Sequence, residues 1–260
     1  MKIVSLSPAV TETLSLLGLE DEIVGITPWC KMYLRDSNKD VVGTYLTINF
    51  DKLKRLSPDI VFIQSRVHDK FYRVLIDMGF NTYLIPLPTN IYAVISHIVL
   101  DVGAIVGRYI ESRELGDRMA EEISRIRRSV DRDKPVKVYI EYLWPDKTYS
   151  TSGSLTFIDD AIRIAGGLNI YSDTPKEFFF PRDEDTVARD PQIILVNIEP
   201  PFEDLTLDEY KAIRSSLASL GAYRENRIYL VRESRNVNLT HFGPSIVSTI
   251  RYIADILRSL

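Results

Sequence analysis

Cysteine is almost absent from this 260-residue chain, and its scarcity excludes several classes of site. Cys30 is the only cysteine, so an intramolecular disulfide is impossible and a zinc site built on cysteine pairs is excluded. The three histidines, His68, His97 and His241, form no HxxxH or HExxH motif. The common helical metal-site signatures are therefore missing, and we expect no metal centre and no catalytic cofactor.

An excess of one charge and long apolar runs are also missing. Lys and Arg total 32 and Asp and Glu total 36, which gives a net charge of −4. This balance lacks the excess of basic residues expected of a nucleic-acid binder, and it argues against binding to an anionic membrane. The most apolar long stretch, residues 91–106, contains His97 and Asp101 and is shorter than the ~20 residues of a membrane span.

Signatures of catalysis and of targeting are missing as well. The sequence has no Gly-rich phosphate loop, no Ser-His-Asp order in a matching context and no paired-carboxylate pocket. Asp159 and Asp160 fall at a predicted helix start, where acids are favoured without a catalytic role. Met1-Lys2 leads directly into an apolar strand, and no signal-like segment precedes it. Taken alone, this start indicates either a cytoplasmic protein or a targeting segment outside this chain.

Short apolar runs alternate with helical patterns in the first third of the chain. Ser7-Pro8 and Asn49 suit helix starts. Strand–helix–strand units at this spacing predict a parallel sheet with helices on its faces. The predicted strands cover residues 3–6, 22–26, 59–64 and 82–85, and the predicted helices cover 8–17, 50–56 and 69–78.

Residues 90–130 contain no proline, and their apolar positions recur every three or four residues, which predicts one long helix. Gly103 and Gly107 weaken its middle and would mark any bend. The βα pattern then returns. It predicts strands at 136–142, 193–196 and 227–231 and helices at 152–166 and 243–257. The sequence thus predicts an α/β protein with a lobe of residues 1–89, a helix at 90–131 and a lobe of residues 132–260.

One sequence pattern occurs in both predicted lobes. Asp51 lies seven residues before Pro58, Glu184 lies seven residues before Pro191, and each proline leads into an apolar strand. This repeated pattern favours two related lobes, although helix–loop–strand joints often look alike.

Four segments of the chain closely resemble class III substrate-binding proteins of ABC importers, which capture cobalamin, iron–siderophores and haem. The segments are IVSLSPAVTETLSLLG (3–18), VGIT (24–27), VGTYLTINFD with LSPDIV (42–61) and TSGSLTFIDD through AGGLN (151–169). The first and third are most similar to the cobalamin-binding branch. The resemblance implies two Rossmann-like lobes with parallel sheets joined by a long rigid helix. It also implies a ligand in the inter-lobe cleft, only slight hinge motion and no covalent chemistry.

The resemblance also implies a place and a partner. It implies an extracytoplasmic monomer, periplasmic or anchored at the cell surface, that delivers its ligand to a permease dimer with ATPase subunits. In this family one acid per lobe docks into arginine pockets of the permease, and Asp51 and Glu184 stand at those positions. Without any partner, an acid at a helix start is already favoured by the free N–H groups there.

A corrin ring is large and flat, so its recognition requires aromatic faces and a few hydrogen-bonding groups. Alignment with the cobalamin-binding branch puts Trp29, Tyr45 and Tyr142 at aromatic ligand-binding positions. Trp29 and Tyr45 also follow predicted strand ends, where open α/β sheets bind ligands. Further candidates are Trp144 and one member of the run Phe178 to Phe180, with Phe178 and Phe180 retained. Each could instead be an ordinary core or surface aromatic.

Several positions depart from the cobalamin-binding pattern. Gln64 stands where an aromatic is expected, and His241 falls nearest the place of an arginine. Arg66 and Arg235 could clamp an anionic siderophore, and His241 could ligate haem iron or cobalt or simply cap backbone groups. The sequence thus predicts a corrinoid-binding protein, with iron–siderophore or haem binding as the alternative. A cytoplasmic ligand-sensing module and an enzyme on the same scaffold are the alternatives from other classes.

Overall fold

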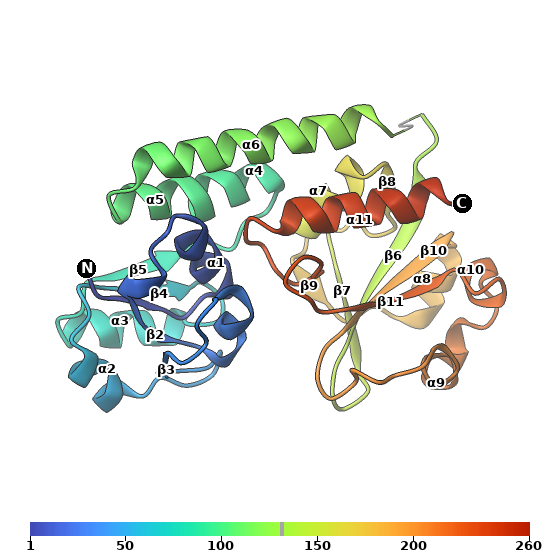
Figure 1. Cartoon of the computed structure of the whole chain (residues 1–260). Coiled ribbons are helices and arrows are strands. Elements are labelled where there is room, and N and C mark those ends of the chain that lie inside the picture. The colour runs from blue at the N-terminus through green and yellow to red at the C-terminus, as the bar shows by residue number, and fades with distance from the viewer. Residues whose placement is uncertain (131–132) are drawn as a thin grey trace. The chain divides into compact units, whose positions relative to one another are not determined.

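The computed structural model (Figure 1) describes residues 1–130 and 133–260. Its contacts divide the chain into two compact units. Unit 1 comprises Met1–Pro88, Tyr92–Met119 and His241–Pro244, and unit 2 comprises Thr89–Ile91, Ala120–Thr240 and Ser245–Leu260. The predicted helix end at residue 131 and the predicted lobe start at residue 132 lie outside the described residues.

Unit 1 is built on a parallel sheet with the strand order β3-β2-β1-β4-β5. The strands are β1 (Ile3–Ser5), β2 (Ile23–Ile26), β3 (Asp40–Val41), β4 (Ile60–Gln64) and β5 (Thr82–Ile85). The connecting helices are α1 (Pro8–Leu16), η1 (Glu20–Glu22), η2 (Pro28–Tyr33), α2 (Phe50–Leu56) and α3 (Asp69–Asp77). The parallel βα architecture predicted for this region is confirmed.

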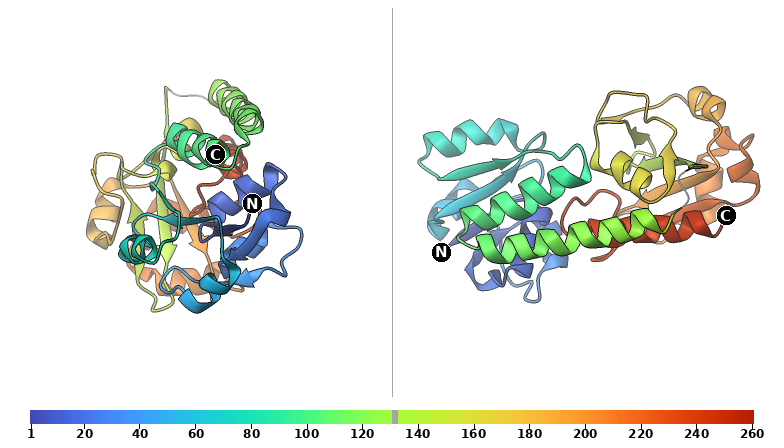
Figure 2. Two further views of the ribbon diagram at one scale, coloured as in Figure 1. Left: turned by 90° about the vertical axis from the view of Figure 1, so that its left-hand side faces the viewer. Right: turned by 90° about the horizontal axis from the view of Figure 1, so that it is seen from above.

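Helices cover both faces of this sheet, which explains why its central strands β1 and β4 are apolar except for Ser5 and Gln64 at their carboxyl ends. Val4 and Val61 pack on Leu53 of α2 and Leu75 of α3. Phe62 follows Val61, so its side chain points to the opposite face of the sheet, and it is equally buried. In the view from above in Figure 2, the sheet of unit 1 lies between α3 and the helical segment that contains α5 (Asp101–Ile105).

The single helix predicted over residues 90–130 is wrong in one respect, because the chain turns in its middle. Helix α4 (Ile91–Ala93), the π-helical segment η3 (Val94–Leu100) and α5 form one arm, and α6 (Tyr109–Arg128) forms the other. Figure 1 shows the turn between the arms. Gly107 adopts a φ of +73° there, a left-handed conformation that glycine enters without strain. A Cβ at Gly103 would collide with Ser112, so glycine permits the close approach of α5 and α6.

The boundary between the units falls within α6, after Met119. The helix therefore contributes residues to both units. Its predicted role as a rigid connection between lobes stays a prediction.

Unit 2 contains a mixed sheet with the order β11-β10-β6-β7-β9, and β8 pairs with the start of β6. The strands are β6 (Val136–Leu143), β7 (Tyr149–Ser152), β8 (Gly167–Asn169), β9 (Phe178–Phe179), β10 (Ile193–Ile198) and β11 (Ile228–Arg232). Strands β6, β10 and β11 are parallel, whereas β7 runs antiparallel to both β6 and β9. The α/β class is confirmed, but the expectation of a wholly parallel second sheet is wrong at this edge.

The antiparallel edge arises because β6 and β7 are joined by a tight turn instead of a crossover helix. The Trp144 amide donates to the Thr148 carbonyl at 2.8 Å, and the Lys147 amide donates to the Trp144 carbonyl at 2.8 Å. The helix predicted from Ser152 therefore begins later. Helix α7 (Phe157–Ile164) starts after Thr156, whose side chain accepts a hydrogen bond from the Asp159 amide. The remaining helices are α8 (Asp183–Arg189), α9 (Leu207–Ile213), η4 (Ser215–Leu217), α10 (Gly221–Arg224) and α11 (Ile246–Arg258).

A buried ion-pair network fixes the parallel part of this sheet. Glu141 of β6 is completely buried, and its carboxylate receives the Arg214 Nε at 2.9 Å and the Tyr210 hydroxyl at 2.9 Å. Arg214 also donates to Asp183 of α8 at 2.8 Å. Burial raises the pKa of the Glu141 carboxyl, and Arg214 and Tyr210 partly offset this effect. The network thus ties β6 to α8 and α9.

We predict that Arg214→Leu destabilises the protein by about 3–5 kcal/mol, because it leaves the buried Glu141 carboxylate without its counter-charge. Urea denaturation measures the loss. The matched control is Arg224→Leu, an exposed arginine of α10, which should change stability by less than about 0.5 kcal/mol. Equal effects of the two substitutions would contradict the role of the network.

Candidate functional site

The carboxyl edge of the unit 1 sheet holds most of the side chains that the sequence singled out in this unit. Strand order reverses at β1, with β2 on one side and β4 on the other. In open parallel sheets, ligands bind outside the carboxyl ends of the strands at such a point. Trp29 follows β2, Tyr45 follows β3, and Gln64 ends β4 with Arg66 just beyond.

Trp29 and Tyr45 form an aromatic pair at this edge, although 16 positions separate them in the sequence. Their ring centroids are 4.3 Å apart with an interplanar angle of 33°. Trp29 is 38% exposed, so a large apolar surface faces solvent there. The loop that carries Tyr45 is held by Thr44, whose hydroxyl accepts from the Thr47 amide at 3.1 Å. The tilted stack leaves part of the Trp29 ring exposed to solvent, and an exposed aromatic ring of this kind can bind a planar ligand.

Buried hydrogen bonds of Gln64 and His68 fix the same edge of the unit 1 sheet. The Ser7 hydroxyl donates to Gln64 Oε1 at 3.4 Å, and only 8% of Gln64 is exposed. His68 Nδ1 accepts from the Gln64 amide at 3.2 Å and its Nε2 donates to the Thr44 carbonyl at 3.0 Å. Burial lowers the pKa of His68, so the neutral imidazole joins β4 to the Tyr45 loop. Arg66 is exposed and has a φ of +69°, a strained conformation for a non-glycine residue.

His241 lies in unit 1 and is buried against α1. Its Nε2 lies 2.7 Å from Glu12 Oε2, and its ring stacks on Tyr33 with centroids 4.2 Å apart. Because Nε2 faces a carboxylate, this nitrogen is not directed at a metal. Among residues 1–130 and 133–260, no cluster of three or more His, Cys, Asp or Glu side chains could hold a metal ion. The Glu12 partner was missed, because 229 positions separate it from His241.

The corresponding edge of unit 2 carries a second aromatic group. Tyr142, at the end of β6, is 5% exposed and meets Phe178 edge-on, with ring centroids 5.5 Å apart. Phe179 points to the other face and packs on Tyr171, so the alternation along β9 selects Phe178 from the run. Phe180, beyond the strand, is 69% exposed.

Two further predicted residues lie on loops of unit 2. Trp144 is 46% exposed, and its indole N–H donates to Ser150 Oγ at 3.0 Å. Arg235 is exposed in the segment after β11. The ligand-binding roles of all these residues stay predictions.

A carboxylate pair at this edge was missed in the sequence. Glu199 directly follows β10 and Glu233 directly follows β11, so each is placed by the end of a parallel strand, which was the available signal. Burial raises the pKa of Glu233 to about 7, and the negative charge of Glu199 adds to the rise. Burial also raises the pKa of Glu199.

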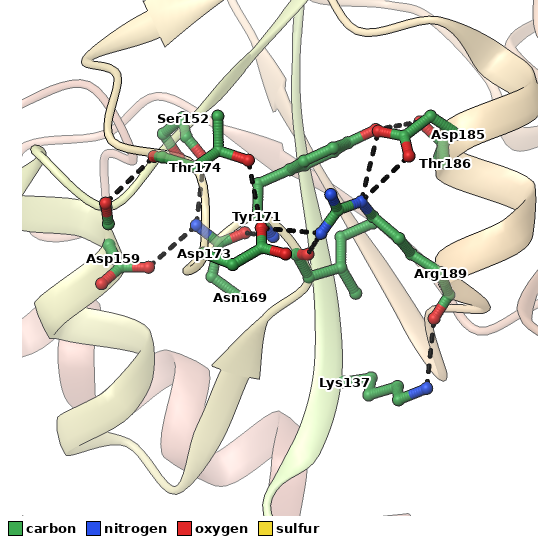
Figure 3. Close-up of polar contacts among 12 residues, drawn as sticks. Lys137, Ser152, Asp159, Asn169, Tyr171, Asp173, Thr174, Asp185, Thr186 and Arg189 are labelled. Carbon is green, nitrogen blue, oxygen red and sulfur yellow. Dashed lines mark hydrogen bonds and ion pairs between the residues drawn. The ribbon is translucent and has the colours of Figure 1, made fainter.

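Asp51 and Glu184, the two acids near helix starts, lie on helices that are fixed by a capping hydrogen bond or by ion pairs. Glu184 is exposed on α8, whose far end is fixed by Arg189 (Figure 3). Arg189 pairs with Asp173 at 2.8 Å and lies over the Tyr171 ring. Asp51 is exposed on α2, where the Asn49 side chain accepts from the Lys52 amide at 2.9 Å and so caps the helix. Within the described part of the chain, neither acid forms an ion pair.

Family comparison agrees with this architecture. The family model described as "Periplasmic binding protein" matches residues 3–234, and the chain belongs to that family. No helix in the described ranges is long and apolar enough to cross a membrane.

Individual relatives are distant but match along most of the chain. The chain is 23% identical over 258 residues to a cobalamin-binding protein of Halobacterium salinarum, covering 98% of this chain and 68% of the relative. It is 22% identical over 202 residues to a vitamin B12-binding protein of Yersinia pestis, covering 75% of this chain and 69% of the relative.

Solved structures establish the fold. A periplasmic heme-binding protein from Roseiflexus sp. RS-1 superposes with a TM-score of 0.86 at 22% identity, covering 99% of this chain and 98% of that one. The periplasmic vitamin B12-binding protein of Vibrio cholerae superposes with a TM-score of 0.80 at 17% identity, covering 99% and 96%.

The titration of Glu233 generates a prediction about stability. Its pKa is raised in the folded protein from 4.5 to about 7, so the unfolded chain releases this proton first as pH rises. The free energy of unfolding should therefore fall between about pH 4.5 and pH 7, by roughly 1–3 kcal/mol for this partly exposed group. Burial and the nearby charge of Glu199 raise the pKa of Glu233, and hydrogen bonds from Asn238 and Thr240 only partly offset this rise.

Glu233→Gln should remove this part of the pH dependence, as measured by urea denaturation at pH 5 and pH 8. The exposed Glu203→Gln is the matched control and should keep the wild-type difference. Parallel behaviour of Glu233→Gln and wild type at both pH values would show that Glu233 titrates normally.

Proposed function

We propose that the chain is the substrate-binding protein of an ABC importer and that it captures a corrinoid of the cobalamin type. It binds without covalent chemistry and works outside the cytoplasm. Family membership over residues 3–234 supports a binding role. The names of the relatives from Halobacterium and Yersinia support cobalamin as the ligand.

The Trp29–Tyr45 pair is the observation that carries the proposal. Two aromatic rings with centroids 4.3 Å apart sit at the carboxyl edge of a parallel sheet, and one of them is 38% exposed. A corrin ring is a wide flat surface, and its contact with such a pair would remove apolar area from water on both sides. Gln64, Arg66, Tyr142, Trp144, Phe178, Phe180 and Arg235 are proposed as further ligand contacts.

Haem or a ferric chelate is the second candidate, favoured by the likeness to the heme-binding structure and by the exposed Arg66 and Arg235. One feature weighs against an axial role for His241. Its Nε2 is 2.7 Å from the Glu12 carboxylate and only 6% of the residue is exposed. We therefore assign His241 a structural role and rank the corrinoid first.

Delivery requires a partner, and we propose that Asp51 and Glu184 contact the permease. Both are exposed acids near the start of helices that are fixed by caps and ion pairs. A shallow depression lined by Asp183, Val187 and Ser216 lies beside Glu184. Charges at the rim of an interface mainly set encounter rate and register.

Removal of the aromatic pair should weaken ligand binding. Trp29→Ala should cost on the order of 1–3 kcal/mol, or roughly 5- to 150-fold in Kd, because a large aromatic face is lost from the contact. Tyr45→Ala should act in the same direction. Absorbance titration with cyanocobalamin measures both effects.

Tyr72→Ala is the matched control, because Tyr72 is also 38% exposed in unit 1 but lies on α3. It should bind cyanocobalamin like wild type. If Trp29→Ala and Tyr45→Ala also bind every tested corrinoid, haem and ferric siderophore like wild type, the aromatic pair is not the ligand surface.

Reversal of both proposed docking charges should abolish delivery. Asp51→Lys combined with Glu184→Lys should leave folding and ligand affinity unchanged and eliminate uptake, as measured with the cognate permease and ATPase in proteoliposomes. Both side chains are exposed, so the fold does not depend on them.

Asp69→Lys combined with Asp208→Lys is the matched control. These exposed acids also lie in the first turns of helices, one in each unit, and their reversal should leave uptake intact. Full uptake by the Asp51/Glu184 double variant would refute the docking role and leave only the helix-start explanation for these acids.

A further inference from the structure

The carboxyl edge of the unit 2 sheet carries a cluster of hydrogen-bonding groups beside the ring contact of Tyr142 with Phe178. Glu199 and Glu233 follow the adjacent parallel strands β10 and β11. Asn197 of β10 stands opposite Tyr142 of β6 in the strand register. We call Tyr142, Asn197, Glu199, Glu233 and Thr240 the acceptor cluster.

Hydrogen bonding leaves most of the acceptor capacity of the two carboxylates unused. Asn197 Nδ2 donates to Glu199 Oε1 at 2.7 Å, and Asn238 Nδ2 donates to Glu233 Oε1 at 2.6 Å. The Thr240 hydroxyl lies 3.3 Å from Glu199 Oε1 and 3.4 Å from Glu233 Oε1, but only 2.8 Å from Asn238 Oδ1. A hydroxyl has one proton to donate, so Thr240 satisfies at most one of these three acceptors at a time.

Two deeply buried polar groups in the cluster have no partner. Asn197 is 2% exposed and Tyr142 is 5% exposed. Within the described residues, neither Asn197 Oδ1 nor the Tyr142 hydroxyl makes a hydrogen bond. The other end of the Asn197 amide binds Glu199, and Tyr142 stands opposite Asn197 in the strand register, so both groups belong to the cluster. Burial is the main cause that raises the pKa of Tyr142, and the negative charge of Glu199 adds to the rise. A buried polar group without a partner costs about 1–3 kcal/mol, which a bound hydrogen-bond donor would recover.

The negative charge of the cluster has no internal counter-charge. Over residues 1–130 and 133–260, neither Glu199 nor Glu233 forms an ion pair with a lysine or arginine. Arg232 precedes Glu233 but donates instead to the backbone carbonyls of Glu203 and Leu205, each at 2.8 Å. The cluster therefore presents acceptors and negative charge to any molecule that meets it.

We propose that the acceptor cluster is a ligand subsite that takes N–H donors, specifically the carboxamide arms of a corrinoid, and that it rejects ligands with carboxylate arms. The inference rests on the proposed function. A carboxamide offers two N–H donors, which suit Asn197 Oδ1 and the free carboxylate oxygens. A carboxylate arm offers no donor and brings like charge against Glu199 and Glu233. The subsite would thus favour corrinoids over haem, whose periphery carries carboxylates.

Two corrinoids that share one ring separate this chemistry from ring recognition. Dicyanocobinamide carries carboxamide arms, and dicyanocobyrinic acid carries carboxylates in their place. In absorbance titrations at pH 8, wild-type protein should bind dicyanocobinamide more tightly by about tenfold or more. In Glu199→Gln with Glu233→Gln, the preference should fall to about threefold or less, because repulsion is removed and acceptors remain.

Control variants isolate the cluster from net charge. Glu203→Gln with Asp204→Asn makes the same change in charge at exposed positions and should keep the wild-type preference. The single variants Glu199→Gln and Glu233→Gln should each lose part of it, which provides the test if the double variant unfolds.

The outcomes distinguish this inference from the function on which it rests. Equal binding of both corrinoids by wild-type protein, or an unchanged preference in the cluster variants, overturns the subsite and leaves corrinoid capture standing. Binding of neither corrinoid overturns the proposed function itself.

Discussion

Parallel strand pairing is the constraint on which both candidate ligand surfaces depend. In unit 1, β2 pairs with β1 and with β3 in parallel register, so the segments after β2 and β3 emerge at one edge. The edge brings Trp29 to Tyr45 although neither is near the other in sequence. In unit 2, β6, β10 and β11 do the same for Tyr142, Glu199 and Glu233.

Some buried polar groups of this protein have their hydrogen bonds made within the protein, whereas others lack a partner among the described residues. His68 and the Glu141–Arg214 pair have their hydrogen bonds made within the protein, and they hold strand ends and helices in place. Asn197 Oδ1 and the Tyr142 hydroxyl are equally buried but have no partner in the described part of the chain. Since an unmet buried polar group is costly, these two groups support the proposal that an external molecule binds at this edge.

Much of the fold could be predicted from the sequence, because strand and helix periods differ clearly in the βα segments. The strand Thr82–Ile85 and the helix Phe50–Leu56 appear with the predicted bounds. Gly103 and Gly107 marked the place of a possible bend, but the separation into two helical arms could not be predicted, because the apolar spacing continues across it and a positive φ leaves no trace in hydrophobic periodicity. Strand β7 was missed because its sequence, Tyr-Ser-Thr-Ser, has no apolar alternation.

The candidate site was predicted less completely, for a physical reason. Trp29, Tyr45 and Tyr142 were named from the resemblance to the cobalamin-binding branch, because aromatic residues at matching motif positions are visible in a sequence. Polar partnerships over long separations are not visible: Glu12 with His241 and Glu199 with Glu233 depend on the tertiary fold. Which member of the run Phe178 to Phe180 contacts Tyr142 also needed the structure, because the pleat of β9 decides which face each ring takes.

Corrinoid capture is the central claim, and a side-by-side titration of the wild-type protein tests it most directly. The purified chain is titrated with cyanocobalamin, haem and a ferric siderophore, and absorbance and equilibrium dialysis report binding. The account predicts saturable, one-to-one binding of cyanocobalamin that is tighter than binding of either iron compound. Saturable binding of haem or the siderophore with no binding of cyanocobalamin would contradict it.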